Sequence, residues 1–409
     1  MTRILIVGNH TCGNRGDAAI LRGLLECLEG AIPGCQATIL SRFPTSSSWI
    51  MGRTLEVDTL NAYYNENAKG RLGGLKAKLL RRFIPWLLNA HATGSAWARH
   101  IDLPRRHRDY IESLKAYDLV IQVGGSFFVD LYGPTQYDHA LCALLAGKPI
   151  YMIGHSVGPF QNPLFRKISQ DVMARVDALA LREEVSLKHM ADGQVPVDKV
   201  RTAADTAWLV STGAAPPLHN EPTVAVTFRE LAPFDKRLGI SQETYEKAFA
   251  ELLDAVADEG YRIQALSTCT AIDGYPKDDR MIALRVRNHM RRADAMDVEM
   301  GELSDVQLGD RFARCVLTIG TRLHSAIMSM NFGTPAVALA YEHKSEGVMK
   351  RLGTSELSMP VKSLLDGTLK AKVLGLLQDE ALRPRIAQAV AREKAFAREA
   401  VLATVGVGS

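Results

Sequence analysis

The sequence predicts an α/β protein built from two Rossmann-like halves. Short apolar runs alternate with amphipathic stretches of helical length, a pattern that is typical of parallel sheets flanked by helices. This alternation breaks once, over residues 211–222 (STGAAPPLHNEP), where Pro, Gly and small residues indicate a linker. The length of 409 residues also favours two hydrophobic cores over one.

In the first half, each expected strand is a short apolar run that ends in glycine or polar residues. The expected strands are residues 4–7, 37–41, 118–123, 149–153 and 178–181, and residues 18–28 form the first expected helix. Three of these strands are followed by the clusters GNHTCGNRGD, GGSFFVD and GHSVGP. Ligands bind beyond the carboxyl ends of parallel strands, so the clusters are candidate site segments.

The second half repeats the alternation. The expected strands are residues 223–228, 262–267, 315–319 and 336–340, and the expected helices are residues 242–259, 278–289 and 326–331. Residues 376–405 are helical in pattern, with a break or a helix start at Pro384. We therefore expect three parts: a domain over 1–212, a domain over 223–376 and a C-terminal helix over 377–409.

Composition excludes several classes of protein. A formal net charge of +4 is too mild to indicate a nucleic-acid partner. The six cysteines form no CxxC pair or Cys/His cluster, which favours free thiols in a reducing compartment and predicts no metal site. The first apolar run is too short for a signal peptide, and no run approaches the ~18 apolar residues that span a bilayer. We therefore expect a cytoplasmic protein.

The segment LTIGTRLHSA in the second half is the strongest candidate site. An apolar strand runs into Gly320, and Arg322 and His324 then open a helix, whose free N–H groups favour anions. Arg229 and Lys344 also follow strands of this half. Arginine binds carboxylate and phosphate bidentately, lysine acts as a point charge, and histidine exchanges protons near neutral pH. This set predicts a pocket for a multiply charged anion.

Polar residues in the first half form a second group of candidates. The candidates are Asn14, Asp17, Gly125, Ser126, Asp130 and His155. The glycines let the backbone approach a ligand, and histidine can bind a sugar hydroxyl or a phosphate. Neither GxGxxG nor GxxxxGK[ST] is present, so no motif supports NAD or P-loop chemistry. Structural roles compete with these assignments, because Asp17 can cap a helix and His155 can pack in a turn.

Residues 69–108 stand out by charge. Lysine and arginine dominate this segment, Asp102 is its only acid, and leucine and aromatic residues interleave with the cations. A basic amphipathic helix of this kind can lie on an anionic membrane surface. The alternative is a solvated helix that covers the sheet, with its Lys and Arg stems packed on apolar neighbours.

Several longer stretches carry a family resemblance. They are GNHTCGNRGDAAILRGLL, IQVGGSFFVDLYG, MIGHSVGPFQ, FRELAPFDKRLG, ALSTCTAIDGYPKDDRM, GTRLHSAIMSMNF and YEHKS. With these motifs the chain resembles the bacterial polysaccharide pyruvyl transferases, and among them the colanic acid branch of enteric bacteria. The resemblance is weakest over residues 43–115 and in the C-terminal helix.

The resemblance implies a fold like that of the GT-B glycosyltransferases, with a cleft between two Rossmann-like domains. It implies transfer of a pyruvyl group from phosphoenolpyruvate to a sugar, which gives a cyclic ketal. The acceptor would be a lipid-linked exopolysaccharide repeat unit at the inner membrane face, where the protein can be peripheral. The first domain would hold the acceptor and the second the phosphoenolpyruvate, and no cofactor or metal would be needed.

The resemblance also assigns roles to residues. Arg322 and His324 match the donor-site motif of the family, and Arg229 matches an arginine after the first strand of the second domain. Ketal formation needs a general acid, for which His324 is the candidate. It also needs a general base, and Asp17, His155 and Asp130 all remain open for that role.

Two other functions compete with this one. A sugar-nucleotide glycosyltransferase can share the fold, and Glu342 or Glu346 would then grip the ribose. A non-enzymatic component of a membrane-bound polysaccharide complex is the other, and the basic segment over residues 69–108 is its support.

Overall fold

The computed structural model describes residues 1–214, 216–341 and 343–406, with the backbone alone for 343 and 344. It confirms the α/β fold class, because two parallel sheets carry helices between their strands. The chain forms two compact units. The first unit comprises Met1–Thr11, Ile20–Leu209 and the chain from Phe396, and the second comprises Cys12–Ala19 and Val210–Ala395.

The first unit is built on a sheet with the strand order β3-β2-β1-β4-β6-β7-β8, in which β5 pairs with β6. Its strands are β1 (Arg3–Asn9), β2 (Gln36–Ser41), β3 (Glu56–Val57), β4 (Leu119–Gln122), β5 (Gly125–Phe128), β6 (Ile150–Val157), β7 (Ala178–Leu181) and β8 (Val200–Thr202). Its helices are α1 (Arg15–Ala31, which begins in the second unit), α2 (Pro44–Met51), α3 (Thr59–Asn67), α4 (Gly73–Ala92), α5 (Arg105–Ser113), α6 (Asp138–Leu145), α7 (Pro163–Met173) and α8 (Val185–Asp192).

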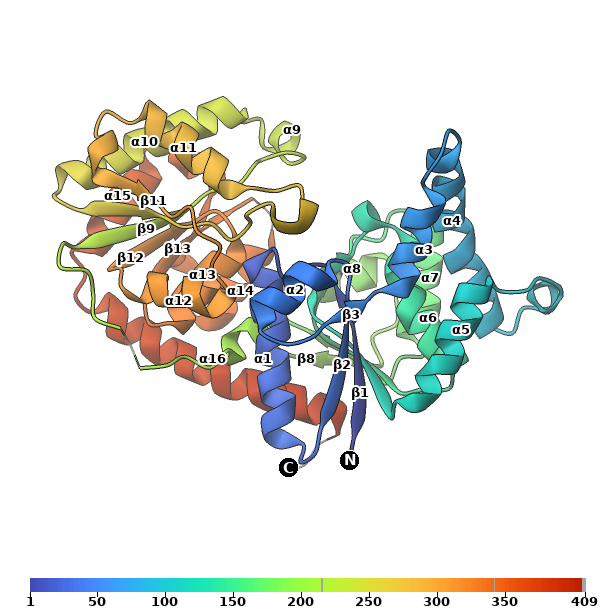
Figure 1. Ribbon diagram of the computed structural model, residues 1–409. Coiled ribbons are helices and arrows are strands. Elements are labelled where there is room, and N and C mark those ends of the chain that lie inside the picture. The colour runs from blue at the N-terminus through green and yellow to red at the C-terminus, as the bar shows by residue number, and fades with distance from the viewer. Residues whose placement is uncertain (215, 342, 407–409) are drawn as a thin grey trace. The chain divides into compact units, whose positions relative to one another are not determined.

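The second unit has the strand order β11-β10-β9-β12-β13-β14. Its strands are β9 (Thr223–Thr227), β10 (Arg262–Ala265), β11 (Met296–Val298), β12 (Leu317–Gly320), β13 (Ala336–Ala340) and β14 (Ser358–Pro360). Its helices are α9 (Asp235–Leu238), α10 (Gln242–Asp258), α11 (Asp279–His289), α12 (Asp305–Ala313), α13 (Leu323–Asn331), α14 (His343–Leu352), α15 (Thr368–Leu377) and α16 (Leu382–Val405, which ends in the first unit). Helices α10 and α11 cover one face of the sheet and α12 and α13 the other (Figure 1).

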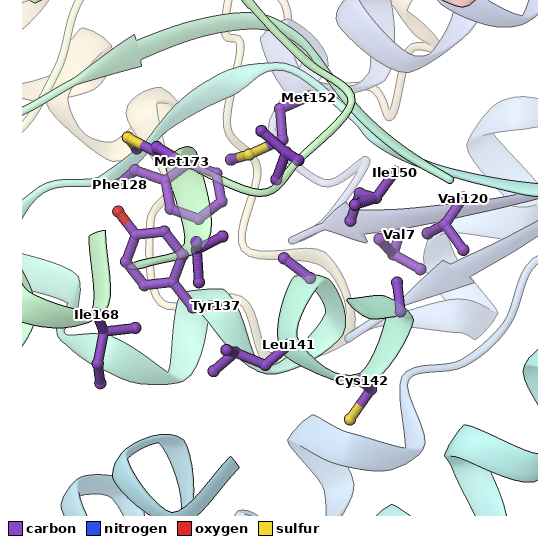
Figure 2. Packing of buried hydrophobic residues seen from close by; sticks show 14 of the residues in the cluster. Val7, Val120, Phe128, Tyr137, Leu141, Cys142, Ile150, Met152, Ile168 and Met173 are labelled. Carbon is purple, nitrogen blue, oxygen red and sulfur yellow. The ribbon is translucent and has the colours of Figure 1, made fainter. Parts of the chain in front are cut away.

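Buried strands explain why the sequence shows continuous apolar runs in place of alternation. In the first unit, Val7, Val120 and Ile150 come from the neighbouring strands β1, β4 and β6 and are fully buried (Figure 2). The rings of Phe128 and Tyr137 lie 4.7 Å apart, centroid to centroid, in the same core. Helices α6 and α7 close this core with apolar residues of their inner faces.

The structure corrects the sequence interpretation at two turns of the first unit. The GHS segment was expected to end a strand at residue 153, but β6 continues to Val157. Gly125, expected in a strand-end turn, instead begins β5 and pairs with His155. Both expectations are wrong because β5 and β7 offer parallel partners on either side of β6, which extend the ladder past the glycine.

The ends of the predicted domains also need adjustment. The turn before α1 was expected in the first domain, but Cys12–Ala19 packs with the second unit. The C-terminal helix was expected as a separate part, whereas α16 contributes residues to both units. Pro384 lies in the first turn of α16, where a missing N–H costs no helical hydrogen bond.

The basic segment over residues 69–108 forms α4, a short 3-10 helix and the start of α5. Its arginines differ in their surroundings. Arg105 pairs with Asp109 and Arg106 with Glu66, whereas Arg81 lies over the ring of Tyr64. Within the described residues, the helices are all too short or too polar to cross a bilayer.

Candidate active site

The carboxyl ends of β9 and β12 form the switch point of the second sheet. The chain order reverses between these two neighbours, and open α/β sheets bind ligands at such a point. Thr227 pairs in parallel with Gly320, so the residues that follow both strands leave the sheet at the same edge. Arg229 follows β9 and Arg322 follows β12. The structure therefore brings two of the predicted anion-binding residues to one edge of one sheet.

The segment between β12 and α13 is held by a short network of hydroxyl groups. Arg322 is the N-cap residue of α13, with extended backbone angles (φ −105°, ψ 129°). The hydroxyl of Ser325 donates to the Arg322 carbonyl (2.6 Å) and accepts from Thr227 Oγ1 (2.8 Å). A Cβ atom at Gly320 would lie 2.3 Å from this hydroxyl, so the strand must end in glycine here. The network fixes the helix N-terminus, and the N–H groups of the first turn point outward from it.

The side chain of Arg322 is fixed by a buried carboxylate. Its Nε and Nη2 atoms each donate to one oxygen of Asp279, both at 2.8 Å, and Asp279 is 1% exposed. Burial alone would lower the pKa of Arg322, but the paired Asp279 raises that pKa well above its ordinary value. Nη1 takes no part in this pair.

Arg229 is held in a different way, between aromatic rings. Its guanidinium carbon lies 3.9 Å from the ring centroid of Tyr341 and 5.1 Å from that of Phe234. Its Nε donates to the carbonyl of Glu230 (3.0 Å), and the residue is 7% exposed. Stacking on ring faces stabilises a guanidinium through cation–π attraction while its N–H edge keeps its donors.

His324, the second residue of α13, is half-buried and packs against the turn that opens α1. A Cβ atom on Gly16 would lie only 2.7 Å from the Cβ, Cγ and Nδ1 atoms of His324. The backbone of Gly16 therefore forms one wall of the space around the imidazole. Both residues belong to the second unit, so this contact is internal to one compact body.

The turn that opens α1 is anchored by Arg15, whose side chain is 1% exposed. Arg15 donates from Nη2 to Glu302 (2.7 Å), from Nη1 to the Gly13 carbonyl (2.7 Å) and from Nε to the Leu303 carbonyl (2.5 Å). Asn14 forms an antiparallel bridge with Cys269 and accepts from the Gly16 N–H with Oδ1 (3.1 Å). These bonds join the turn to the second unit.

Asp17 lies at the same turn and is half-buried. Burial raises the pKa of Tyr275, and the nearby carboxylate of Asp17 adds to that increase. Burial likewise raises the pKa of Cys269 to about 12, against the effect of the Arg322 charge. Asp17, Tyr275 and Cys269 thus share an environment with Arg322, and the predicted base candidate Asp17 belongs to the same unit as His324.

The remaining candidates lie in the first unit, where the structure gives them structural partners. Ser126 accepts from Nη2 of the buried Arg182 (2.7 Å), which also donates to Ser156 (2.9 Å) and Asp205 (2.5 Å). Asp130 accepts from the backbone N–H groups of residues 161 and 162, just before α7. Gly125 has φ +150°, and a Cβ atom there would lie 2.5 Å from the ring of Phe127.

His155 is fully buried within β6. Its Nε2 lies 3.2 Å from the carbonyl oxygen of Gln122, and its ring packs edge-on against Phe128, 5.1 Å between centroids. Burial lowers the pKa of His155 to about 3, so the ring is neutral at physiological pH. A neutral ring enclosed in the sheet favours a packing role over the predicted contact with a sugar or a phosphate.

Two predicted residues fall outside what the structure describes. The side chain of Lys344 and the whole of Glu342 lie outside the described residues. Among the residues that are described, no group of three or more His, Cys, Asp or Glu side chains could hold a metal ion.

With this geometry in view, comparisons with known proteins identify the family. A profile of the polysaccharide pyruvyl transferases matches residues 14–343, a range that includes Asn14 in the turn that opens α1 and Arg322 between β12 and α13. The chain belongs to this family. The amylovoran biosynthesis protein AmsJ of Erwinia amylovora is 50% identical over 404 residues, which are 96% of each chain. The family resemblance is therefore confirmed, and the colanic acid branch stays a prediction.

Solved structures with similar folds support the architecture of this pyruvyl transferase family member. The UDP-GlcNAc 2-epimerase of Neisseria meningitidis superposes with a TM-score of 0.60 at 10% identity and covers 100% of both chains. The MnaA–UDP structure from S. aureus gives 0.60 at 13% identity and covers 98% of this chain and 94% of its own. These likenesses show the GT-B-like fold of two Rossmann-like units, and the predicted cleft stays a prediction.

Sequence reasoning missed three residues that shape this family member's site. Asp279 is the first residue of α11, after the N-cap residue Asp278, and its carboxylate holds Arg322. Arg15 lies inside the GNRGD motif, and Tyr341 follows β13 directly. The position of Tyr341 just beyond a strand end was a usable signal, whereas the Asp279–Arg322 pair spans 43 residues and has no local signal.

Proposed function

We propose that the chain transfers the pyruvyl group of phosphoenolpyruvate to a sugar of a lipid-linked exopolysaccharide repeat unit, where it forms a cyclic ketal and phosphate is released. The reaction would take place at the cytoplasmic face of the inner membrane and would use no cofactor. Family membership and the amylovoran relative support a transferase of polysaccharide biosynthesis. The observation that supports the donor assignment is that Arg229 and Arg322 both follow strands that end at the switch point, where Arg322 caps the N-terminus of α13.

The two arginines suit the two anionic groups of phosphoenolpyruvate. Arg229 is fixed by ring stacking and Arg322 by Asp279, so neither side chain must be ordered when the ligand binds. Such preorganisation reduces the entropy cost of binding. The N–H groups at the start of α13 add further donors for an oxyanion. Lys344 is the proposed third cation.

His324 supplies the proton in the proposed chemistry. Protonation of the methylene carbon makes the neighbouring carbon electrophilic, and the first sugar hydroxyl adds there while it loses its proton to a base. The carbon–oxygen bond to phosphate then breaks, and the second hydroxyl closes the ketal. Of the two hydroxyl protons, one balances the new methyl group and the other leaves with phosphate. We assign the base role to Asp17, which lies in the same unit as His324.

Three of the predicted candidates for contact with the acceptor already have partners within the first unit. His155 is fully buried, Ser126 accepts a hydrogen bond from Arg182, and Asp130 accepts from the backbone just before α7. Asn14 and Asp17, at the turn beside His324, are the better candidates for contact with the sugar. Gly125 keeps its predicted role only as a place where backbone can approach a ligand.

Incubation of the purified chain with phosphoenolpyruvate and a defined oligosaccharide acceptor tests the proposal. Mass spectrometry should show the pyruvylated acceptor, and phosphate should appear only when the acceptor is present. His324→Ala should lower kcat by about 10²–10⁴-fold, as expected for loss of a general acid. Arg322→Lys should raise the KM for phosphoenolpyruvate, because lysine cannot reproduce the paired geometry.

The proposal fails if the acceptor gains a hexose from a nucleotide sugar, or if phosphate release is independent of the acceptor. The first result would establish the glycosyltransferase alternative. If neither the acceptor nor a donor is changed in any combination, although both are shown to bind, the chain would be a non-enzymatic component.

A further inference from the structure

Helix α4 carries a row of apolar side chains on its solvent-exposed face. Leu75 is 61% exposed, Leu79 62%, Phe83 42% and Trp86 39%, and Leu72, just before the helix, is 76% exposed. At about 100° per residue, these positions fall within an arc of about 80° on the helix surface. An amphipathic helix of a globular protein normally turns such an arc toward the core.

The opposite face of α4 already fulfils that role. Ala77, Ile84, Leu87 and Leu88 are buried, and the helix packs against α6 and α7 through this side. The exposed row, which we call the outer apolar row (Leu72, Leu75, Leu79, Phe83 and Trp86), is therefore an addition to the core-facing surface. Its apolar surface is larger than core packing of this helix requires.

Aromatic residues extend the row at its C-terminal end. The ring of Trp86 stacks on that of Trp97, with centroids 4.2 Å apart and an interplanar angle of 18°. Trp97 is itself 37% exposed. Leu79, Phe83, Trp86 and Leu164 line a groove on this surface together with Arg82. Tryptophan is enriched where one side of a ring meets lipid and the other meets water.

Cations border the outer apolar row on both sides. Lys76 and Arg82 are exposed and lie about 60° to either side of Leu79 on the helix surface. Lys69, Arg71 and Lys78 are also exposed nearby. From residue 69 to residue 101 the sequence contains no Asp or Glu. The row is thus an apolar strip between positive borders, and the partner that complements it is apolar with an anionic rim.

We propose that the outer apolar row docks on an anionic lipid surface, with α4 parallel to the membrane plane and its apolar side chains among the lipid headgroups and upper acyl chains. A lipid surface satisfies both the apolar strip and the cations. A second copy of this chain would bring like charges together along the same strip, which disfavours it as the occupant. The proposal stands apart from the transfer reaction, because it concerns a different surface.

Vesicle flotation of the full-length protein tests the docking. The vesicles are phosphatidylcholine alone, or phosphatidylcholine with phosphatidylglycerol as the anionic lipid. We expect binding to the anionic vesicles only, and at least tenfold weaker binding for Leu79→Gln/Phe83→Gln and for Lys76→Glu/Arg82→Glu. The matched control is Leu187→Gln/Val197→Gln, which changes two exposed apolar residues outside α4 and should bind like the parent. Quenching of tryptophan fluorescence by lipid with brominated acyl chains should accompany binding.

Several outcomes would overturn the proposal. They are absence of binding to anionic vesicles, equal binding by Leu79→Gln/Phe83→Gln, and a dimer that this variant abolishes while vesicles stay unbound. The last result would assign the face to a second copy. Transfer to a soluble acceptor should be unchanged in Leu79→Gln/Phe83→Gln, so failure of the docking and failure of the proposed reaction give different results.

Discussion

At position 16 only a hydrogen atom fits in place of a side chain, because the imidazole of His324 occupies the adjacent space. The nearest atoms of His324 would lie 2.7 Å from a Cβ at this position. Gly16 is in the first turn of α1, with a backbone that alanine can adopt. The second glycine of the GNRGD motif, Gly16, is therefore required by a contact within the second unit and not by turn geometry.

Gly16→Ala should displace His324 and lower kcat at least tenfold while the protein stays folded. The control is Gly30→Ala in the same helix, where a Cβ meets nothing within 4 Å. Alanine there should stabilise the helix by about 0.5–1 kcal/mol and leave kcat unchanged. Steady-state kinetics and thermal unfolding of both variants check this prediction. A fully active Gly16→Ala would show that the contact between residue 16 and His324 does not position the imidazole.

Two adjacent carboxylates, Asp278 and Asp279, differ in burial and therefore in how much each contributes to the free energy of unfolding. Asp279 pairs with Arg322 and is 2% exposed at its side chain, whereas Asp278 pairs with Arg280 and is 19% exposed. A buried charge that loses its partner costs far more than a charge near solvent.

Asp279→Ala should lower the free energy of unfolding by about 3–5 kcal/mol, because it leaves Arg322 charged and without its carboxylate. Asp278→Asn should cost under about 1 kcal/mol, since asparagine also caps a helix and the lost ion pair is near solvent. Urea unfolding of the two variants measures the difference. Equal losses of unfolding free energy would mean that burial does not determine how much an ion pair contributes to stability.

At the scale of elements, helices α3 and α5 of the first unit enclose a neutral histidine. His107 on α5 is fully buried and lies edge-on to Tyr63 and Tyr64 of α3, with centroids 5.3 and 6.5 Å apart. Its two ring nitrogens find no hydrogen-bond partner among the described residues. Burial, with help from the charges of His139 and Arg106, lowers the pKa of His107 to about 4. The packing of these helices therefore depends on the uncharged ring.

This pKa gives the first unit a dependence on pH. A histidine whose pKa is lower in the folded state stabilises fully above its ordinary value of 6.5, and that stability is lost as pH falls toward about 4. The loss should reach about 3 kcal/mol at pH 4. His107→Phe keeps the ring and should remove this part of the acid sensitivity.

Urea unfolding at pH 7.5 and pH 5 checks the effect of His107→Phe. The advantage of the variant over the parent should be larger at pH 5. His100→Phe is the control, because His100 is exposed and its replacement should leave the pH dependence unchanged. A constant difference between variant and parent at both pH values would show that His107 does not titrate in this range.

At the scale of the whole molecule, the last turns of α16 form a small apolar cluster with the sheet of the first unit. Ala400 and Phe396 of α16 pack on Ala180 of β7 and on Ala203, which follows β8. Small residues on both sides let the helix approach the strands closely. Residues about 200 positions apart thus stabilise one another.

Ala400→Asp should lower the free energy of unfolding by about 2–4 kcal/mol, because it puts a charge among buried alanines. Ala403→Asp changes an exposed residue less than one turn away and should cost under about 0.5 kcal/mol. Chemical unfolding followed by circular dichroism compares them. Similar stability of the two variants would show that α16 does not contribute to this core.

The sequence could predict most elements because their signals are local. Apolar runs, glycine at strand ends and Pro384 near a helix start located most strands and the last helix. It could not predict that β6 continues through His155, because that depends on β5 and β7 as partners. For the same reason, the sequence interpretation of His155 as a ligand contact did not anticipate its burial.

By itself the sequence determined the fold class, the family and the two arginines and the histidine of the candidate site, since each depends on composition, order and motif within a few residues. Only the tertiary structure decided which groups surround them. It paired Arg322 with Asp279, placed Arg229 on Tyr341 and set Gly16 against His324. These contacts join residues 43 to 308 positions apart, and such pairing depends on how packed surfaces meet in space, which a local pattern does not encode.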